Sequence, residues 1–180
     1  VPDAYSTSTT ILTRTRPLTP RLVALLGWAG ASGCTLTHTA VVPLDVVKTR
    51  AQKRSDRAAT NLVQQAQQMV ATEGISSLWL GWDATIVGYF WYGLSVYPVY
   101  ALGKQAWGMS MGASLAAGAM AAIVASLGLT PLEAARIRAV NGDSTGLWRT
   151  LQELKEDQAL YSGLSSLVIR QVVFGSINFL

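Results

Sequence analysis

The chain has 180 residues, of which 50% are hydrophobic and only 13% are charged. A soluble domain carries about 25% charged residues, so this composition indicates a protein of the lipid bilayer. The net charge of +4 does not indicate a nucleic-acid partner, because Arg and Lys lie at the ends of apolar segments and form no basic patch on a soluble face. The single cysteine, Cys34, excludes an intrachain disulfide and any metal site built from cysteine pairs.

Residues 1–19 form the first segment, which is rich in Ser, Thr and Arg and contains one acid, Asp3. This composition fits two alternatives. One is an ordinary flexible terminus, and the other is the remnant of a cleaved organelle presequence. We therefore predict a flexible N-terminal segment that stands apart from the rest of the fold.

Long apolar runs follow this segment. Three contain no Asp, Glu, Lys or Arg, and a fourth begins near Leu164: the charge-free runs are Leu22–Leu44, Ala84–Gly103 and Gln105–Leu132. About 20 apolar residues cross a bilayer, and a backbone in hydrocarbon must satisfy its own hydrogen bonds, so we interpret these runs as helices. The predicted membrane helices are 20–47, 83–103, 110–136 and 164–180.

An eight-residue element, which closes the first and third runs, occurs twice. Pro43-Leu44-Asp45-Val46-Val47-Lys48-Thr49-Arg50 recurs 88 positions later as Pro131-Leu132-Glu133-Ala134-Ala135-Arg136-Ile137-Arg138. Each proline should kink its helix, because it removes a backbone donor and clashes with the preceding turn. A short segment with apolar residues at helical spacing follows each copy, which predicts surface helices at 58–71 and 146–155.

Further along the chain, each copy is followed by an acid and then by an aromatic residue, Trp79 or Tyr161, that lies two positions before a glycine. The chain therefore divides into one repeat over 20–104 and a second over 105–180, in which the second helix is truncated. The twofold recurrence of this spacing resembles the mitochondrial carrier family. Within it, Thr37–Asp45, Pro131–Arg136 and Ile169–Gln171 are most similar to the phosphate carriers.

The resemblance implies an all-α membrane bundle with four transmembrane helices and two short surface helices on the matrix side. The family has three repeats around a central substrate cavity, so this chain supplies about two of them. The resemblance also implies the mitochondrial inner membrane. The membrane of another organelle, such as a plastid, is the alternative location.

Site residues carry over from the same resemblance. In the family, the acid of one repeat pairs with the first base of the next to close the matrix gate, which implies a pair between Asp45 and Arg136. Gln52 lies where a glutamine brace is expected. Lys48 and Glu133 would take partners from a third repeat.

His38 is an ionisable group in the middle of a predicted membrane helix, which makes it a functional candidate. In the resembling phosphate carriers, a histidine at this position is linked to proton-coupled transport. The alternative is a neutral imidazole bonded to Thr35, Thr39 or a neighbouring helix.

Arg170 and Gln171 fall at a substrate contact of the fourth helix in the resembling carriers. A guanidinium there can hold phosphate through two hydrogen bonds. The alternative is an arginine that reaches the membrane interface or a bound lipid.

The sequence also departs from the phosphate carriers. Where they carry an amide, a lysine and an acid on the second helix, this chain has Tyr92, Val96 and Ala101, and it keeps only Lys104. In place of two carboxylic residues on the third helix it has Ala122 and Ser126.

Two functional hypotheses follow. The first is a phosphate carrier-like transporter that moves phosphate with a proton. The second is a transport-inactive, carrier-derived structural subunit of a larger membrane complex. The sequence contains no nucleophile with a base, no metal-ligand cluster and no glycine-rich phosphate loop, so we predict neither an enzyme nor a cofactor. The expected partners are the bilayer with bound anionic lipid, inorganic phosphate and other subunits, without nucleic acid.

Overall fold

The computed structural model describes residues 18–53, 61–108, 110–142 and 146–178, with side chains described to Phe174. Every regular element in these ranges is a helix, which confirms the all-α prediction. In chain order the elements are α2 (Pro20–Lys53), α3 (Leu62–Glu73), the 3₁₀ helix η1 (Ile75–Trp79), α4 (Trp82–Trp107), α5 (Met111–Val140), α6 (Leu147–Glu156) and α7 (Leu164–Asn178).

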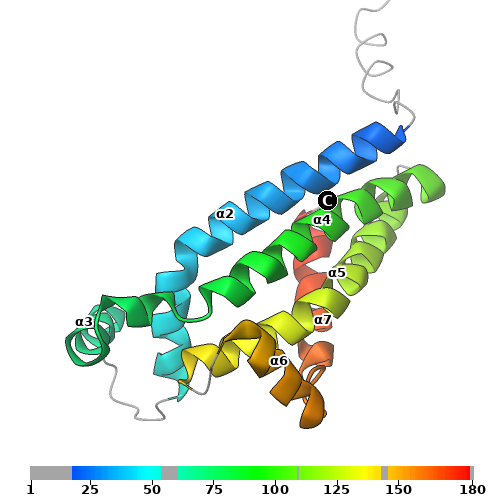
Figure 1. Cartoon of the computed structure of the whole chain (residues 1–180). Coiled ribbons are helices and arrows are strands. Elements are labelled where there is room, and N and C mark those ends of the chain that lie inside the picture. The colour runs from blue at the N-terminus through cyan, green and yellow to red at the C-terminus, as the bar shows by residue number, and fades with distance from the viewer. Residues whose placement is uncertain (1–17, 54–60, 109, 143–145, 179–180) are drawn as a thin grey trace, which may run out of the picture.

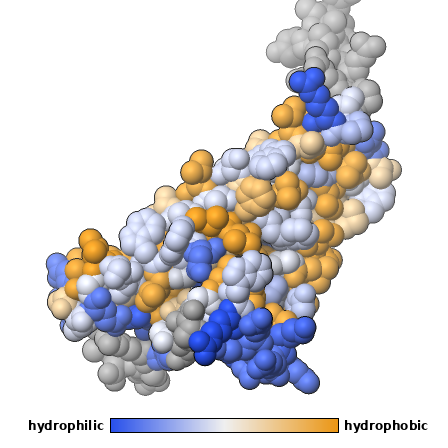
Figure 2. Space-filling view, in the orientation of Figure 1, coloured by the Kyte–Doolittle hydropathy of each residue, from blue (hydrophilic) through white to orange (hydrophobic). Residues whose placement is uncertain are grey.

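The four long helices form the bundle. Helix α4 packs against both α2 and α5, and α5 packs against α7 (Figure 1). The two short helices, α3 and α6, lie at one end of the bundle, as the sequence predicts for surface helices that share one side (Figure 1). Hydrophilic residues gather at this end, over α6 and near α3, whereas hydrophobic residues cover much of the long helices (Figure 2).

The four long helices begin within one residue of the predicted starts. The surface helix α3 begins at Leu62 where the sequence predicts 58, and α3 and α6 end one or two residues beyond the predicted ends. Helices α2, α4 and α5 run to Lys53, Trp107 and Val140, where the sequence predicts ends at 47, 103 and 136. Helix α4 ends where Gly108 takes a positive φ and its N–H bonds the Lys104 carbonyl, because glycine adopts that conformation at little cost. Residues 58–60, 179 and 180 of the predicted helices lie outside the described ranges.

Helix α5 is the one described helix that is both long and apolar enough by composition to cross a membrane, and the apolar part of α7, Leu164–Phe174, is shorter. Helix α2 carries threonines and a histidine in its middle, and α4 is rich in tyrosine and glycine. These residues lower the mean hydropathy of the two helices. Membrane spans at α2, α4 and α7 therefore remain predictions.

Prolines lie inside the helices, and they do not end them. Helix α2 continues through Pro43, and α5 continues through Pro131. Both helices bend in their second halves (Figure 1), as expected where a proline removes one backbone hydrogen bond. Each bend carries the repeated acidic and basic residues away from the line of the first half.

Small residues allow the helices to approach closely. Ser114, Gly118, Ala122 and Ser126 recur every four residues along α5, and all four are buried, so they form a small-residue stripe for close helix contact. A very close approach of two backbones joins α2 and α4. A Cβ atom on Gly93 would overlap the backbone carbonyl of Gly30.

This approach generates a prediction for stability. We expect Gly93→Ala to lower the free energy of unfolding by about 1–3 kcal/mol, because the added methyl meets backbone, which cannot rotate away. Gly112→Ala is the matched control, since a Cβ there meets nothing within 4 Å. Thermal unfolding in detergent measures both. Equal melting temperatures for the two variants would contradict the close helix contact.

Candidate functional site

An ion pair joins the two repeats. The Arg136 Nη2 atom lies 2.9 Å from the Asp45 Oδ2 atom, so α5 and α2 are linked through the basic residue of one repeat and the acid of the other. The Arg136 side chain is 8% exposed and that of Asp45 is 39% exposed. The predicted contact is therefore confirmed, whereas its role as a gate remains a prediction.

Arg136 also holds a second carboxylate. Its Nη1 atom lies 3.5 Å from the Glu133 Oε1 atom, one turn earlier on α5. The guanidinium is thus placed between two acids. Gly81, just before α4, packs over the arginine stem, because a Cβ there would lie 3.1 Å from the Arg136 Cγ atom. The loop between η1 and α4 therefore helps to bury the charge.

The other residues of the predicted gate are arranged differently. Lys48 and Gln52 are exposed near the end of α2. Within the described ranges, neither makes an ion pair or hydrogen bond with the network around Arg136. Glu133 is partly buried and meets Arg136 of its own helix. The roles implied for Lys48, Gln52 and Glu133 remain predictions.

His38 lies between α2 and α4. Its Nδ1 atom is 2.9 Å from the Cys34 carbonyl oxygen, one turn earlier. A carbonyl only accepts, so Nδ1 donates and Nε2 is the nitrogen with a lone pair. The imidazole is stacked on the Tyr89 ring with centroids 3.5 Å apart and planes at 15°. The structure shows no bond to Thr35 or Thr39, which the alternative interpretation named; the Thr37 hydroxyl lies 3.4 Å from Nδ1 instead.

Arg170 and Gln171 lie on α7. Arg170 is exposed and lines a cavity between α5, α6 and α7. Gln171 is half-buried beside it. The structure therefore places the two residues on one helix and gives Arg170 access to the cavity.

The positions that depart from the phosphate carriers are largely buried in helix packing. Val96 is buried with Ala121 and Ala125 in a cluster between α4 and α5. Ala122 and Ser126 are also buried, and the Ser126 hydroxyl donates to the Ala122 carbonyl at 2.7 Å. These side chains fill space between helices and offer no ionisable group.

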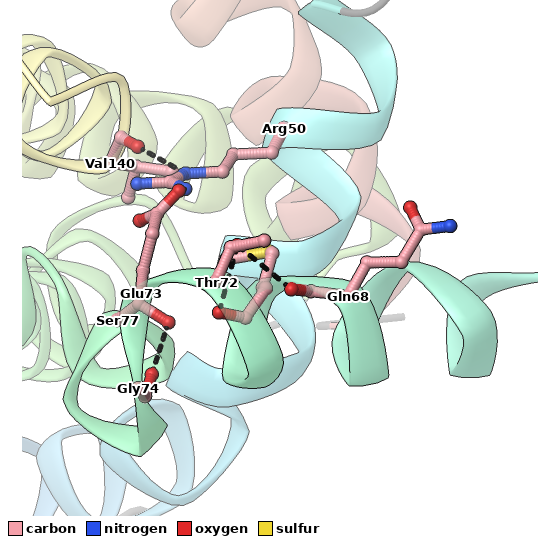
Figure 3. Close-up of polar contacts among 8 residues, drawn as sticks. Arg50, Gln68, Thr72, Glu73, Gly74, Ser77 and Val140 are labelled. Atoms are coloured by element: carbon pink, nitrogen blue, oxygen red, sulfur yellow. Dashed lines mark hydrogen bonds and ion pairs between the residues drawn. The ribbon is translucent and has the colours of Figure 1, made fainter.

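A second interaction, which the sequence reasoning missed, ties three elements together. Arg50 Nε donates to the Val140 carbonyl at 2.8 Å, and its Nη1 atom pairs with the Glu73 carboxylate (Figure 3). Arg50 thus links the ends of α2, α5 and α3. The sequence did contain a signal for this interaction, namely the second base of the repeated element, Arg50, and the acid before Gly74, Glu73.

The second repeat contains the corresponding pair. Arg138, the equivalent of Arg50, bonds Asp157 at 2.7 Å, just after α6. In both repeats the base at the end of a long helix therefore pairs with an acid beside a surface helix. Ion pairs thus attach both surface helices to the bundle.

Known proteins resemble this chain over nearly its whole length. The sequence profile of the family described as mitochondrial carrier protein matches residues 22–109 and 107–180. A mitochondrial phosphate carrier protein of Choristoneura fumiferana is 38% identical over 125 residues, which are 64% of this chain and 36% of that protein.

Two further relatives cover more of the chain. Mitochondrial substrate carrier family protein N of Dictyostelium discoideum is 32% identical over 177 residues, 90% of this chain and 59% of that protein. Solute carrier family 25 member 3 of Homo sapiens is 30% identical over 176 residues, 88% of this chain and 48% of that protein. The chain spans about half the length of the curated relatives it matches.

The ion pair between the repeats generates a prediction. We expect Asp45→Arg and Arg136→Asp each to lower stability by about 1–3 kcal/mol, between the values for exposed and buried pairs. The double variant should recover most of the loss, because the two charges again attract. Thermal unfolding of all four proteins completes the cycle.

The exposed pair Arg149 and Glu153, 3.4 Å apart on α6, provides the control. Reversing both of its charges in the same cycle should change stability little. Strictly additive losses at Asp45 and Arg136 would show that these two residues are not coupled.

Proposed function

Because the chain belongs to the mitochondrial carrier family, whose members are transporters rather than enzymes, we propose that it is a phosphate carrier-like protein of the mitochondrial inner membrane. The observation that carries the proposal is the ion pair of Asp45 and Arg136, which joins two repeats through the residues that the family uses at its gate. The relatives named as phosphate carriers support the choice of substrate.

In this proposal Arg170 and Gln171 contact the phosphate. A guanidinium presents parallel N–H donors that match two phosphate oxygens, and this attraction strengthens where water is excluded. Arg170 suits this role because its side chain is exposed on α7 and borders a cavity between α5, α6 and α7.

His38 is proposed to carry the coupled proton. Its Nδ1 atom is committed to the Cys34 carbonyl, so Nε2 is the nitrogen that takes up and releases a proton. Stacking on Tyr89 fixes the plane of the ring. Asp45 and Arg136 would separate when the path opens at the end where α3 and α6 lie, and would pair again when it closes.

A second candidate is a transport-inactive structural subunit of a larger membrane complex. The specific observation that favours it is the burial of Val96, Ala122 and Ser126 between helices, at positions where phosphate carriers have charged groups. A phosphate path without these charges has lost attraction for the anion and a relay for the proton. Other subunits would then cover the exposed apolar residues of α2 and α7.

Transport measurements test the proposal. We expect the natural protein in proteoliposomes to take up phosphate in a saturable manner driven by a pH gradient. Arg170→Gln should raise the KM for phosphate at least about tenfold, because a charge-assisted hydrogen bond is lost. His38→Gln should abolish the response to the pH gradient. Arg149→Gln, which removes an exposed charge on α6, is the control and should retain both properties.

The 180-residue chain tested by itself should exchange no phosphate above protein-free vesicles, because a carrier distributes its gates and its site over three repeats. Two measurements on the natural protein separate the candidates. An intact mass near 19.2 kDa, co-purification with a much larger complex in mild detergent and no uptake would establish the structural subunit. A mass about half as large again with uptake would establish the carrier.

A further inference from the structure

Arg136 has one acidic partner from the other repeat and one from its own. The Asp45 carboxylate comes from α2, whereas Glu133 lies one turn before Arg136 on α5. A movement of α2 away from α5 would take Asp45 from the guanidinium and would leave Glu133 in place. The retained carboxylate matters because the Arg136 side chain is nearly buried, and a buried charge without a partner is costly.

The two distances show that the contact with Glu133 is not at its optimum while Asp45 is present. Arg136 Nη2 lies 2.9 Å from the Asp45 carboxylate, whereas Nη1 lies 3.5 Å from that of Glu133. Charge-assisted hydrogen bonds of this kind are about 2.7–2.9 Å long, so the second contact can still shorten. The two carboxylates also repel each other, because they share one cation. On separation from Asp45, Glu133 would therefore gain a shorter bond and lose a repulsion.

Arg50 shows the same arrangement from the side of the first repeat. Its Nε atom donates to the Val140 carbonyl at the end of α5, and its Nη1 atom pairs with Glu73, the last residue of α3 (Figure 3). The carbonyl belongs to the other repeat and the carboxylate to its own. For both arginines, the partner that a separation would remove lies across the repeats, and a carboxylate of the same repeat would stay.

Val140 lies where the two repeats meet. Its side chain is 1% exposed and belongs to a buried cluster that includes Val46 and Val47 of α2 and Met69 of α3. These three neighbours come from the first repeat. If the end of α2 moved away together with α3, the Val140 side chain would reach solvent. Its accessibility therefore reports on opening at this end of the bundle.

We propose that Glu133 is the counter-ion that Arg136 keeps when the gate opens, and that it makes opening less costly. Glu133 acts through Arg136, so it is a positioning residue. The two carboxylates then have opposite effects, because Asp45 holds the gate closed whereas Glu133 favours its opening. This inference rests on the proposed gate and adds to it a role for a carboxylate whose partner lies on its own helix.

The labelling rate of a thiol at position 140 tests the proposal. In the full chain, Cys34→Ser removes the native thiol and Val140→Cys introduces the reporter, which a water-soluble maleimide reaches when the gate opens. Mass spectrometry of the protein in lipid nanodiscs measures the rate, which follows the open fraction. We expect Glu133→Gln to lower this rate about tenfold, since the pair is intermediate between exposed and buried ones. Asp45→Asn should raise it.

Two controls are matched to this experiment. Glu153→Gln also removes an acid from an ion pair within one helix, but from the exposed pair with Arg149 on α6, and it should leave the labelling rate unchanged. Ser165→Cys places the thiol at an exposed position on α7 instead. This thiol should be labelled equally fast with and without Glu133→Gln, because its access does not depend on the gate.

The direction of the change separates the proposal from a purely structural role of Glu133. A variant that only loosened the fold would be labelled faster, because unfolding also exposes position 140. The proposal is overturned if Glu133→Gln is labelled as fast as the unaltered chain or faster, or if Glu153→Gln slows labelling equally.

The Asp45 variant tells which idea has failed. If Asp45→Asn does not raise the labelling rate, both the proposed gate and this inference are wrong. If it raises the rate while Glu133→Gln does not lower it, this inference alone is wrong. Phosphate uptake enters neither comparison, so a failure of transport leaves the result unaffected.

Discussion

Arg136 is the charge on which the contact between the two repeats depends. Its guanidinium is nearly buried, and it reaches Asp45 on α2 and Glu133 on its own helix. A buried charge is costly without partners, so the helices must stay where both carboxylates surround it. Gly81 closes over the arginine stem. The ion pair thus fixes where the end of α2 meets α5, two helices that otherwise pack mainly against α4.

The same eight-residue element serves two different environments. In both copies its last base, Arg50 or Arg138, pairs with an acid beside a surface helix. The inner charges differ, because Arg136 is buried in an ion pair whereas Lys48 is exposed. Internal symmetry therefore extends to the attachment of the surface helices. It does not extend to the centre of the bundle, where each repeat meets a different neighbour.

Close packing explains why some polar positions of the related carriers are apolar in this chain. Between α4 and α5 the helices approach through small residues, and Val96, Ala122 and Ser126 occupy the space that remains. A lysine or carboxylate at these positions would be desolvated there. By contrast, Arg170 lines a cavity, whereas the nearly buried Arg136 is accompanied by two carboxylates. The ionisable groups among these residues therefore either border open space or have charged partners.

The helices, the two repeats and the family were determined by the sequence itself, because hydrophobic period and motif spacing are local properties of the chain. The pair of Asp45 and Arg136 was also accessible, since the family resemblance implied it. Only the tertiary structure decided that His38 stacks on Tyr89, that Arg50 reaches Val140 and that Arg138 and Arg170 share a cavity. These partners come from distant segments, and their meeting depends on how far each helix is rotated about its axis, which sequence spacing does not specify.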